Sequence, residues 1–363
     1  MDFSRIKDWN NFKTRPFLIS GPCSAETEEQ MQTTCQQLAQ TGKVNVLRAG
    51  IWKPRTRPNA FEGVGKEALT WLKQAGIDNN LPVATEVANA QHVEACLKAG
   101  VDILWIGART TVNPFSVQEV ADALKGVDIP ILVKNPVNPD LQLWIGALER
   151  IHQAGVTKLG AIHRGFSSFQ KTAYRNVPKW EIPIELKATF PEIDIICDPS
   201  HIAGTRSLLA TVAQKAMDLE MTGLMIESHV NPDEAWSDAK QQITPESLNE
   251  LIGNLTIRST EASSFETSSE LTAFRKIIDE IDESLIQTLV SRMALSERIG
   301  QYKLDNNVTI LQIKRWEEIK KTRMEHAHSE GLNNEFVKNL LQLIHKESIR
   351  QQTDVMNKSV TVG

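Results

Sequence analysis

The sequence lacks several features that define whole classes of protein. Its 363 residues include only four cysteines, and no two of them form a Cys-x-x-Cys pair. This scarcity argues against a disulfide framework and predicts free thiols in a reducing cytoplasm. No segment reaches about 18 uninterrupted apolar residues, and the polar start MDFSRIKDWNNFK has no apolar core of a signal peptide. We therefore expect a cytoplasmic protein without a membrane span.

An excess of positive charge is also missing. The chain has 40 basic and 45 acidic residues, which gives a formal net charge of -5. A protein of this charge has no general basic field for holding nucleic acid or an acidic membrane. Local groups of arginine and lysine are therefore interpreted as binding sites for small anions.

What the sequence does contain is a series of eight short apolar segments between Phe17 and His229, separated by helical patterns. Strand–helix alternation predicts an α/β fold with a parallel sheet, either open and doubly wound or closed as a (β/α)8 TIM barrel. A charged or metal-binding residue at almost every strand end favours a closed barrel, because the strand ends of a barrel form one rim. The segments end near Cys23, Arg48, Glu86, Arg109, Lys134, Arg164, His201 and Glu227.

The periodicity changes near residue 270, where apolar residues begin to recur every three or four positions. We predict a barrel domain over 1–257, a Ser/Thr/Glu-rich linker over 258–269, an all-α domain over 270–355 and a disordered tail over 356–363. The all-α domain should hold one long helix and two shorter ones. Three such helices make a poor core alone, so we expect this domain to dimerise.

Two groups of side chains are predicted to meet at the barrel rim. Five cations in one place would repel each other unless an anion lies between them, and Arg and Lys both suit phosphate and carboxylate oxygens. A thiolate, an imidazole and two carboxylates suit a divalent transition ion better than Mg²⁺ or Ca²⁺, although a buried cysteine and a structural histidine would also explain two of them. The cations are Arg48, Lys53, Arg109, Lys134 and Arg164, and the candidate metal ligands are Cys23, His201, Glu227 and Asp238.

Seven motifs in this order resemble the type I-beta form of 3-deoxy-D-arabino-heptulosonate 7-phosphate (DAHP) synthase, over nearly all of residues 15–255. The motifs are GPCS (21–24), RAGIWKPRT (48–56), GAR (107–109), VKNP (133–136), HRGF (163–166), DPSH (198–201) and ESH with SDAKQ (227–241). One motif would be weak, but the ordered set is specific.

The resemblance implies condensation of phosphoenolpyruvate with erythrose 4-phosphate, with one divalent metal ion, for which Mn²⁺ ranks before Fe²⁺, Co²⁺ and Zn²⁺. Cys23, His201, Glu227 and Asp238 match the family's metal ligands. Whether Glu86 or a water held by the metal manages the protons is left open. The residues matching the phosphoenolpyruvate site are Arg48, Lys53, Glu86, Arg109, Lys134 and Arg164, and those matching the erythrose 4-phosphate site are Arg55 and Thr56.

A sister family that uses arabinose 5-phosphate is the nearest rival. The KPRT run at 53–56 argues against it, because that family typically carries a KANRS-like run there. Arg57 departs from the serine that usually follows KPRT.

The helical segments of residues 265–355 resemble the all-helical chorismate mutases. Arg292 and Lys303 lie eleven residues apart and so share one helix face, within about 20°. Arg275 lies about 26 Å from Arg292 along the helix, too far for one small dicarboxylate, so it should serve a partner chain's site. The positions that match the family's substrate site are Arg275, Arg292, Lys303, Arg315, Ser348 and Gln352.

Two functions remain open for this tail. It can rearrange chorismate to prephenate, with Lys303 and Gln352 at the breaking ether oxygen, or it can be a non-catalytic module that binds an effector and dimerises. The complete set of cations favours catalysis, and both roles are compatible. Gln312 and Trp316 replace the acidic residues of some relatives, so their roles are open.

Overall fold

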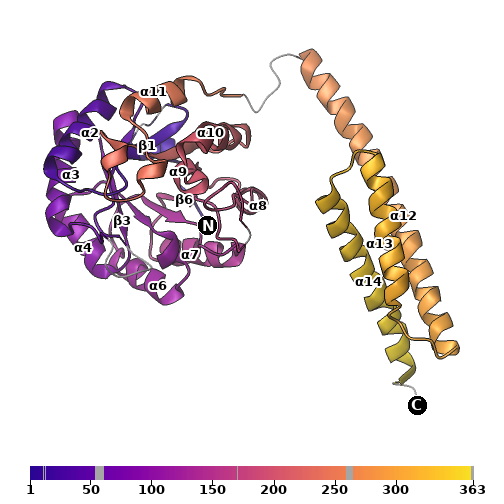
Figure 1. Ribbon diagram of the computed structural model, residues 1–363. Helices are drawn as coiled ribbons and strands as arrows, with labels where there is room; N and C mark the ends of the chain where they lie inside the picture. The colour runs from indigo at the N-terminus through magenta and orange to yellow at the C-terminus, as the bar shows by residue number, and fades with distance from the viewer. Residues whose placement is uncertain (11, 13, 54–60, 170, 259–264, 361–363) are drawn as a thin grey trace. The chain divides into compact units, whose positions relative to one another are not determined.

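The computed structural model describes residues 1–10, 12, 14–53, 61–169, 171–258 and 265–360. The chain divides into two compact units, Met1–Thr260 and Glu261–Gly363. The first unit is an α/β barrel and the second consists of helices only, so the predicted fold class is confirmed for both (Figure 1).

Eight parallel strands form a closed barrel in chain order, and β1 completes it by pairing with β8 (Figure 1). Every strand is short, rich in Ile, Val and Leu, and buried on both faces, as expected for strands inside a layer of helices. The strands are β1 (Phe17–Gly21), β2 (Val46–Arg48), β3 (Val83–Val87), β4 (Ile103–Ile106), β5 (Ile131–Lys134), β6 (Leu159–His163), β7 (Ile195–Cys197) and β8 (Gly223–Glu227).

The helices between the strands begin at residues whose side chains accept a hydrogen bond from the first helical turn. Thr27, Asn89, Asn113 and Asp140 each cap a helix in this way. The helices of this unit are α1 (Ile6–Trp9), α2 (Glu28–Gln40), α3 (Lys66–Asn79), α4 (Ala90–Ala99), α5 (Ala108–Thr111), α6 (Pro114–Ala123), α7 (Leu141–Gln153), α8 (Glu181–Thr189), α9 (Pro199–Ala203), α10 (Leu209–Asp218) and α11 (Pro245–Gly253), with 3₁₀ turns η1 (Arg206–Leu208), η2 (Pro232–Glu234) and η3 (Ala239–Gln241).

The barrel unit has two apolar clusters, one on each face of the sheet. The outer cluster lies between strands and helices. The inner one takes residues from all eight strands, and Trp105 is its largest member. Successive side chains of a strand point to opposite faces, so every second residue belongs to this filled interior.

Helix α1 closes the end of the barrel where the strands begin. Ile6 and Trp9 pack into the inner cluster beside Phe17. The carboxylate of Asp194 accepts a hydrogen bond of 2.6 Å from the Ile6 amide and one of 2.8 Å from the Thr222 hydroxyl. The short helix thus fills space that water would otherwise occupy.

We expect Ile6→Ala to lower the free energy of unfolding of the barrel by about 2–4 kcal/mol, because it leaves a cavity where Ile6 is 1% exposed. Ile77→Ala, at a site that is 62% exposed, is the matched control and should change it by less than about 0.5 kcal/mol. Urea unfolding followed by tryptophan fluorescence measures both. Equal effects of the two substitutions would contradict the role assigned to α1.

The second unit holds three helices, α12 (Phe265–Asp305), α13 (Ile313–Ser329) and α14 (Asn334–Val360), and α14 packs against both others (Figure 1). Two boundaries differ from expectation. Helix α12 begins inside the predicted linker of 258–269, and α14 continues into the predicted tail of 356–363. Extending an existing helix costs little compared with nucleating one, so polar residues beside a strong pattern become helical.

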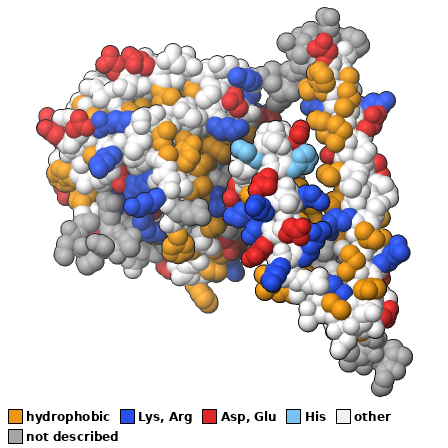
Figure 2. All heavy atoms as spheres, turned by 45° about the vertical axis from the view of Figure 1, so that its right-hand side comes forward, with side chains coloured by type: hydrophobic (Ala, Val, Ile, Leu, Met, Phe, Trp, Pro, Cys, Tyr) orange, Lys and Arg blue, Asp and Glu red, His pale blue; other side chains and the backbone are white. Residues whose placement is uncertain are grey.

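Apolar side chains of this unit lie mostly on its outside. Ala327 and Val337 are the only buried hydrophobic residues that the structure describes in 265–360. Figure 2 shows orange side chains along the long helix. None of the described helices is long and apolar enough to cross a membrane. The exposed apolar residues of α12 are Leu271, Phe274, Ile277, Ile278, Ile281, Leu285, Ile286, Val290, Leu295, Ile299 and Tyr302.

Candidate active sites

Five of the barrel's candidate residues occupy the next inward position after its filled interior. Two residues after Val46 comes Arg48, two after Leu132 comes Lys134, and two after Met225 comes Glu227. The period of two directs these side chains into the same mouth. The same spacing takes Ala84 to Glu86, Ile162 to Arg164 and Ile196 to Asp198.

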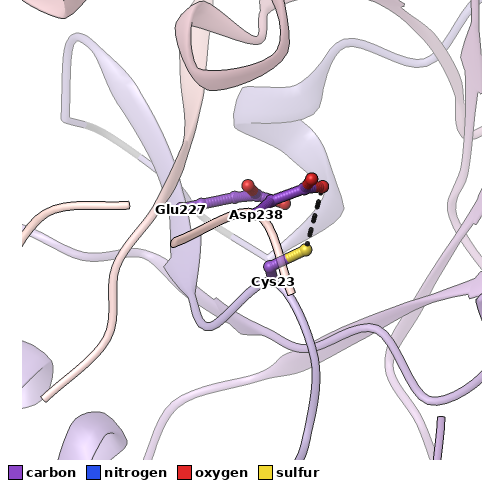
Figure 3. Close-up of side chains that lie close together, drawn as sticks. All are labelled: Cys23, Glu227 and Asp238. Carbon is purple, nitrogen blue, oxygen red and sulfur yellow. Dashed lines mark hydrogen bonds between the residues drawn. The ribbon is translucent and has the colours of Figure 1, made fainter. Parts of the chain in front are cut away.

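Three of the four predicted metal ligands form a tight cluster. Ligand atoms of Cys23, Glu227 and Asp238 all lie within 4.8 Å of one another, and Figure 3 shows the three side chains converging from separate segments. Cys23 Sγ lies 3.5 Å from Asp238 Oδ2. One thiol and two carboxylates at such spacing are a donor set that a divalent transition ion fits.

His201, the fourth predicted ligand, stands beside this cluster rather than within it. Its Nε2 lies 3.9 Å from Glu227 Oε1, and its Nδ1 lies 2.8 Å from Asp198 Oδ2. A carboxylate behind Nδ1 fixes the ring so that Nε2 faces the other ligands. Asp198 also contacts Lys134 Nζ at 2.8 Å, which ties the two groups of predicted residues together.

Cations surround the acidic cluster and compensate its charge. Arg48 Nη1 lies 3.0 Å from Glu227 Oε1, Lys53 Nζ donates to Cys23 Sγ at 2.9 Å, and Arg175 Nη1 lies 3.0 Å from Asp238 Oδ1. Removing charges from water costs several kcal/mol each unless they are paired, so these contacts permit the cluster to be buried.

The local field sets the protonation of the cluster. Burial, and next the charge of Glu227, raise the pKa of the Cys23 thiol to about 12. Burial alone would raise the pKa of Glu227, but His201 and Arg48 lower it below its usual value. Burial and Glu227 oppose ionisation of Asp238, whereas Arg175 and His201 bring its pKa below the usual value. Burial therefore favours the protonated thiol, whereas the neighbouring cations favour the ionised carboxylates.

A second group of contacts faces the inner tryptophan. The indole Nε1 of Trp105 donates to Glu86 Oε2 at 2.9 Å, and Arg48 and Lys134 lie over the ring at 4.9 and 5.7 Å from its centroid. A Cβ at Gly107 would come within 2.2 Å of Glu86 Oε1, so glycine there makes room for this carboxylate.

Arg164 is held by Asn176, whose Oδ1 accepts from Nη1 at 2.7 Å. Burial, partly offset by Asp198, lowers its pKa to about 10, which leaves it charged at neutral pH. Arg109 is exposed and close enough to Arg164 to contribute to that shift. Arg55 and Thr56 lie outside the described residues.

In the helical unit, the predicted site residues of α12 and α14 face each other. Lys303 Nζ donates to Gln352 Oε1 at 3.0 Å, and Arg292 Nη1 donates to Ser348 Oγ at 2.5 Å. Lys303, Ser348 and Gln352 are buried. The same helices that bury these polar groups leave their apolar residues exposed.

Two other predicted residues do not join that group within one chain. Arg315 pairs with Glu318 of its own helix at 2.7 Å, and Arg275 is exposed near the other end of α12. Trp316 stacks on His345 of α14, with ring centroids 3.9 Å apart and 10° between the planes. Gln312 precedes α13 and makes no side-chain cap there.

Comparison with known families matches residues 11–261 to the DAHP synthetase I family. The chain belongs to the DAHP synthetase I family. Residues 274–353 match a second family, chorismate mutase type II. The two resemblances inferred from motifs are thereby confirmed, and the units are called the synthase barrel and the mutase unit below.

The synthase barrel is also similar to curated relatives and to solved structures. Phospho-2-dehydro-3-deoxyheptonate aldolase of Thermotoga maritima is 31% identical over 252 residues, 69% of this chain and 71% of that protein. A 2-dehydro-3-deoxyphosphooctonate aldolase of Vesicomyosocius okutanii is 26% identical over 66% of this chain and 89% of that protein.

A crystal structure of the Thermotoga maritima DAHP synthase aligns at a TM-score of 0.59 and 30% identity, over 65% of this chain and 67% of that one. A truncated form of a synthase from the same organism aligns at 0.57 and 28%, over 65% and 84%. Both likenesses concern about two thirds of this chain.

Sequence reasoning missed several residues of the synthase barrel. Asp198 follows the same spacing as Arg48 and Glu227, so the period of two could have revealed it. Arg175 lies in a loop and Gln241 ends the short 3₁₀ turn η3, yet Gln241 Nε2 donates to Glu227 Oε2 at 2.6 Å and Arg175 contacts Asp238. The regular spacing of residues in strands and helices does not predict residues outside them.

The mutase unit should lose stability as the pH falls below about 6.5. Burial, then Arg292 and Lys303, lower the pKa of His345 in the folded chain. The unfolded chain therefore binds the proton more tightly, so this contribution to stability is present above the ordinary histidine pKa of about 6.5 and is lost as the pH falls below it. His345→Gln should flatten this dependence in calorimetry of the full chain, whereas His326→Gln, at an exposed histidine, should not. Parallel curves for wild type and His345→Gln would contradict this assignment.

Proposed function

We propose that the synthase barrel condenses phosphoenolpyruvate with D-erythrose 4-phosphate to DAHP and phosphate, and that the mutase unit rearranges chorismate to prephenate. Matches to both families support the two activities. One observation carries the first assignment: Arg48 and Lys134, at the ends of β2 and β5, both lie over Trp105, and Arg48 also contacts Glu227 of the Cys23–Glu227–Asp238 cluster. A doubly charged anion and a metal would lie next to each other at that mouth.

The proposed metal site consists of Cys23, His201, Glu227 and Asp238, with Mn²⁺ as the first candidate and Fe²⁺, Co²⁺ or Zn²⁺ as alternatives. Three of the four donors already converge within 4.8 Å, and the protein supplies a fixed imidazole beside them. A bound divalent ion would act as a Lewis acid toward the aldehyde oxygen. Cys23 would bind as a thiolate, so metal binding should release its proton.

The protein's own cations would hold the anionic substrate. Arg48 and Lys134 lie against Trp105, and Arg164 is anchored by Asn176, so their positions are fixed before binding. Phosphoenolpyruvate offers a phosphate and a carboxylate to such groups. Lys53 and Arg109 complete the proposed set, and Arg55 and Thr56 are proposed to contact erythrose 4-phosphate.

The condensation joins C3 of phosphoenolpyruvate to the aldehyde carbon, after which water adds at C2 and phosphate leaves. Glu86 is the protein's candidate for moving a proton, because it lies beside Trp105 and near the anion-binding residues. For the mutase reaction, Arg275 and Arg292 would clamp carboxylates. Lys303 and Gln352 would stabilise charge at the breaking ether oxygen, and Arg315 and Ser348 complete the proposed site.

Separate substitutions should separate the two activities. Lys134→Met should reduce condensation by at least about 10³-fold, since it removes a fixed charge that binds the anion, and leave mutase activity unchanged. Arg292→Gln should do the reverse. Both are measured on the full chain with phosphoenolpyruvate plus erythrose 4-phosphate and with chorismate. Chelation should abolish condensation only, and restoring each divalent ion in turn should rank the metals.

Arabinose 5-phosphate in place of erythrose 4-phosphate tests the rival chemistry. A higher kcat/KM with the five-carbon sugar would overturn the assigned substrate. A complete failure of the Arg292→Gln variant to affect chorismate turnover would instead favour a helical unit that only binds an effector.

We also propose that the mutase unit forms a dimer. Many apolar residues of α12 are exposed, whereas the buried residues described in this unit include Ser296, Lys303, Ser348 and Gln352 and only two hydrophobic ones, which is unusual for a self-contained domain (Figure 2). Pairing with a second copy would bury the exposed apolar residues. It would also allow Arg275 to reach the partner's site.

Leu285→Glu should convert the dimer to monomers and lower mutase activity, because it places a charge on the apolar face where Leu285 is 51% exposed. Glu283→Gln, two residues away on an exposed position, should leave the dimer intact. Light scattering after size exclusion measures the mass. A monomeric wild type with full mutase activity would refute the proposal.

Feedback regulation is proposed for the fused chain, with chorismate or prephenate bound by the mutase unit as the signal to the synthase barrel. Cutting at Thr260, the boundary of the two compact units, should leave a barrel that no longer responds to prephenate. Condensation rates with and without prephenate, before and after the cut, measure the effect. An identical response of the isolated barrel would rule out coupling through the mutase unit.

The four free buried cysteines also support the proposed cytoplasmic location.

A further inference from the structure

A buried carboxylate outside the proposed ligand set connects the segment that carries Cys23 to the segment that carries Asp238. Glu26 follows β1 and is 5% exposed, and His229 follows β8 and is 4% exposed. Glu26 Oε1 accepts from the amide of Trp236 at 2.8 Å, and Glu26 Oε2 lies 3.4 Å from His229 Nε2. Both residues line a cavity of about 300 Å³.

The hydrogen bonds around His229 define which nitrogen carries the proton. The Asn231 amide donates to His229 Nδ1 at 2.9 Å, so Nδ1 must be the unprotonated nitrogen. A neutral ring then carries its proton on Nε2 and donates it to Glu26. Glu26 thus accepts two hydrogen bonds, one on each carboxylate oxygen.

The segment that Glu26 holds leads directly to Asp238. Trp236, whose amide Glu26 binds, lies two residues before Asp238, and the Ser237 hydroxyl pairs with that of Ser24 at 2.5 Å. Asp238 itself adopts a left-handed conformation with φ 50°, which is uncommon outside glycine and needs support from its surroundings. The Cys23 amide donates a hydrogen bond of 2.9 Å to Gln242 Oε1.

We propose that Glu26 is a positioning residue for the metal site, with His229 as its fixed proton donor. It fastens the loop of Asp238 to the loop of Cys23, so that thiol and carboxylate stay at ligand spacing before any ion arrives. The assignment rests on the proposed metal site. It adds a residue that touches neither metal nor substrate.

Glutamine at position 26 is a sharp test, because it keeps the size of the side chain but not its two acceptors. Its carbonyl can accept from Trp236 or from His229, and its NH₂ then faces the remaining donor. The ring cannot adapt by moving its proton, since Nδ1 already accepts from Asn231. Glu29→Gln is the matched control, because Glu29 lines the same cavity but is exposed.

The experiment measures Mn²⁺ affinity of the full chain by electron paramagnetic resonance, with melting temperature as a parallel readout. Glu26→Gln should weaken Mn²⁺ binding about 10-fold, the lower end of the effect of losing a direct partner of a metal ligand, because Glu26 acts on Asp238 through the Trp236 backbone. Saturating Mn²⁺ should restore condensation activity. Glu29→Gln should bind as wild type does. A lower melting temperature with unchanged Mn²⁺ affinity would show a purely structural role and overturn the proposal.

A double-mutant cycle identifies the route of the effect. If Glu26 acts through Asp238, then Glu26→Gln should cause no further loss of affinity in an Asp238→Ala background. Additive losses would overturn the proposal. An Asp238→Ala variant that binds Mn²⁺ as wild type does would instead show that the metal site itself is wrong, and the role of Glu26 with it.

Should Glu26→Gln fail to fold, His229 provides the second test. His229→Gln retains one acceptor and one donor and should keep Mn²⁺ affinity within about 3-fold, whereas His229→Leu should lose about 10-fold. Equal affinities of these two variants would contradict the proposed hydrogen-bond chain.

Discussion

Alternation of side chains along the strands of a closed barrel is the constraint on which the synthase site depends. Every second residue points inward, and the interior below the mouth is filled by Trp105 and its apolar neighbours. The side chains of the next inward residues therefore extend into the mouth of the barrel. Charged groups at those positions must converge, and ion pairs such as Arg48–Glu227 and Lys134–Asp198 keep their burial tolerable.

Such pairs are weak arguments for stability, because the cost of taking charges from water offsets most of their attraction. These ion pairs instead fix the positions of the charged side chains. Arg48 contacts Glu227 of the acidic cluster while lying over Trp105 with Lys134, so one side chain joins the two halves of the mouth. The proposed anion-binding and metal-binding groups are thereby linked through direct contacts.

The barrel and most of its site could be predicted because they follow from local patterns. Short apolar strands ending in charge predicted that Arg48, Lys134 and Glu227 share one rim, and the structure does bring Arg48 to both Glu227 and the ring that Lys134 faces. The parallel order followed from the intervening helices. Arg175, Gln241 and Glu26 were not predicted because they lie outside the strands, in loops or a short 3₁₀ turn, where no period of two relates sequence position to side-chain direction. The linker and tail were judged from composition alone, which overlooks how readily a helix continues into polar residues.

In the mutase unit, fewer of the contacts could be predicted from residue spacing. Spacing on one helix placed Arg292 and Lys303 on a common face, but their partners Ser348 and Gln352 came from family resemblance. The stack of Trp316 on His345 could not be foreseen, because it depends on the register between α13 and α14. The exposed apolar face of α12 was visible in the sequence as a stripe, and its lack of a partner within the unit is a structural finding.

The central claim is that residues from position 23 to position 238 build one metal site at the mouth of the barrel. Anomalous diffraction from a crystal of the full chain grown with Mn²⁺ tests it most directly. The account predicts a single strong peak in the barrel between Cys23, His201, Glu227 and Asp238. A peak elsewhere, or none in that cluster at saturating Mn²⁺, would contradict it.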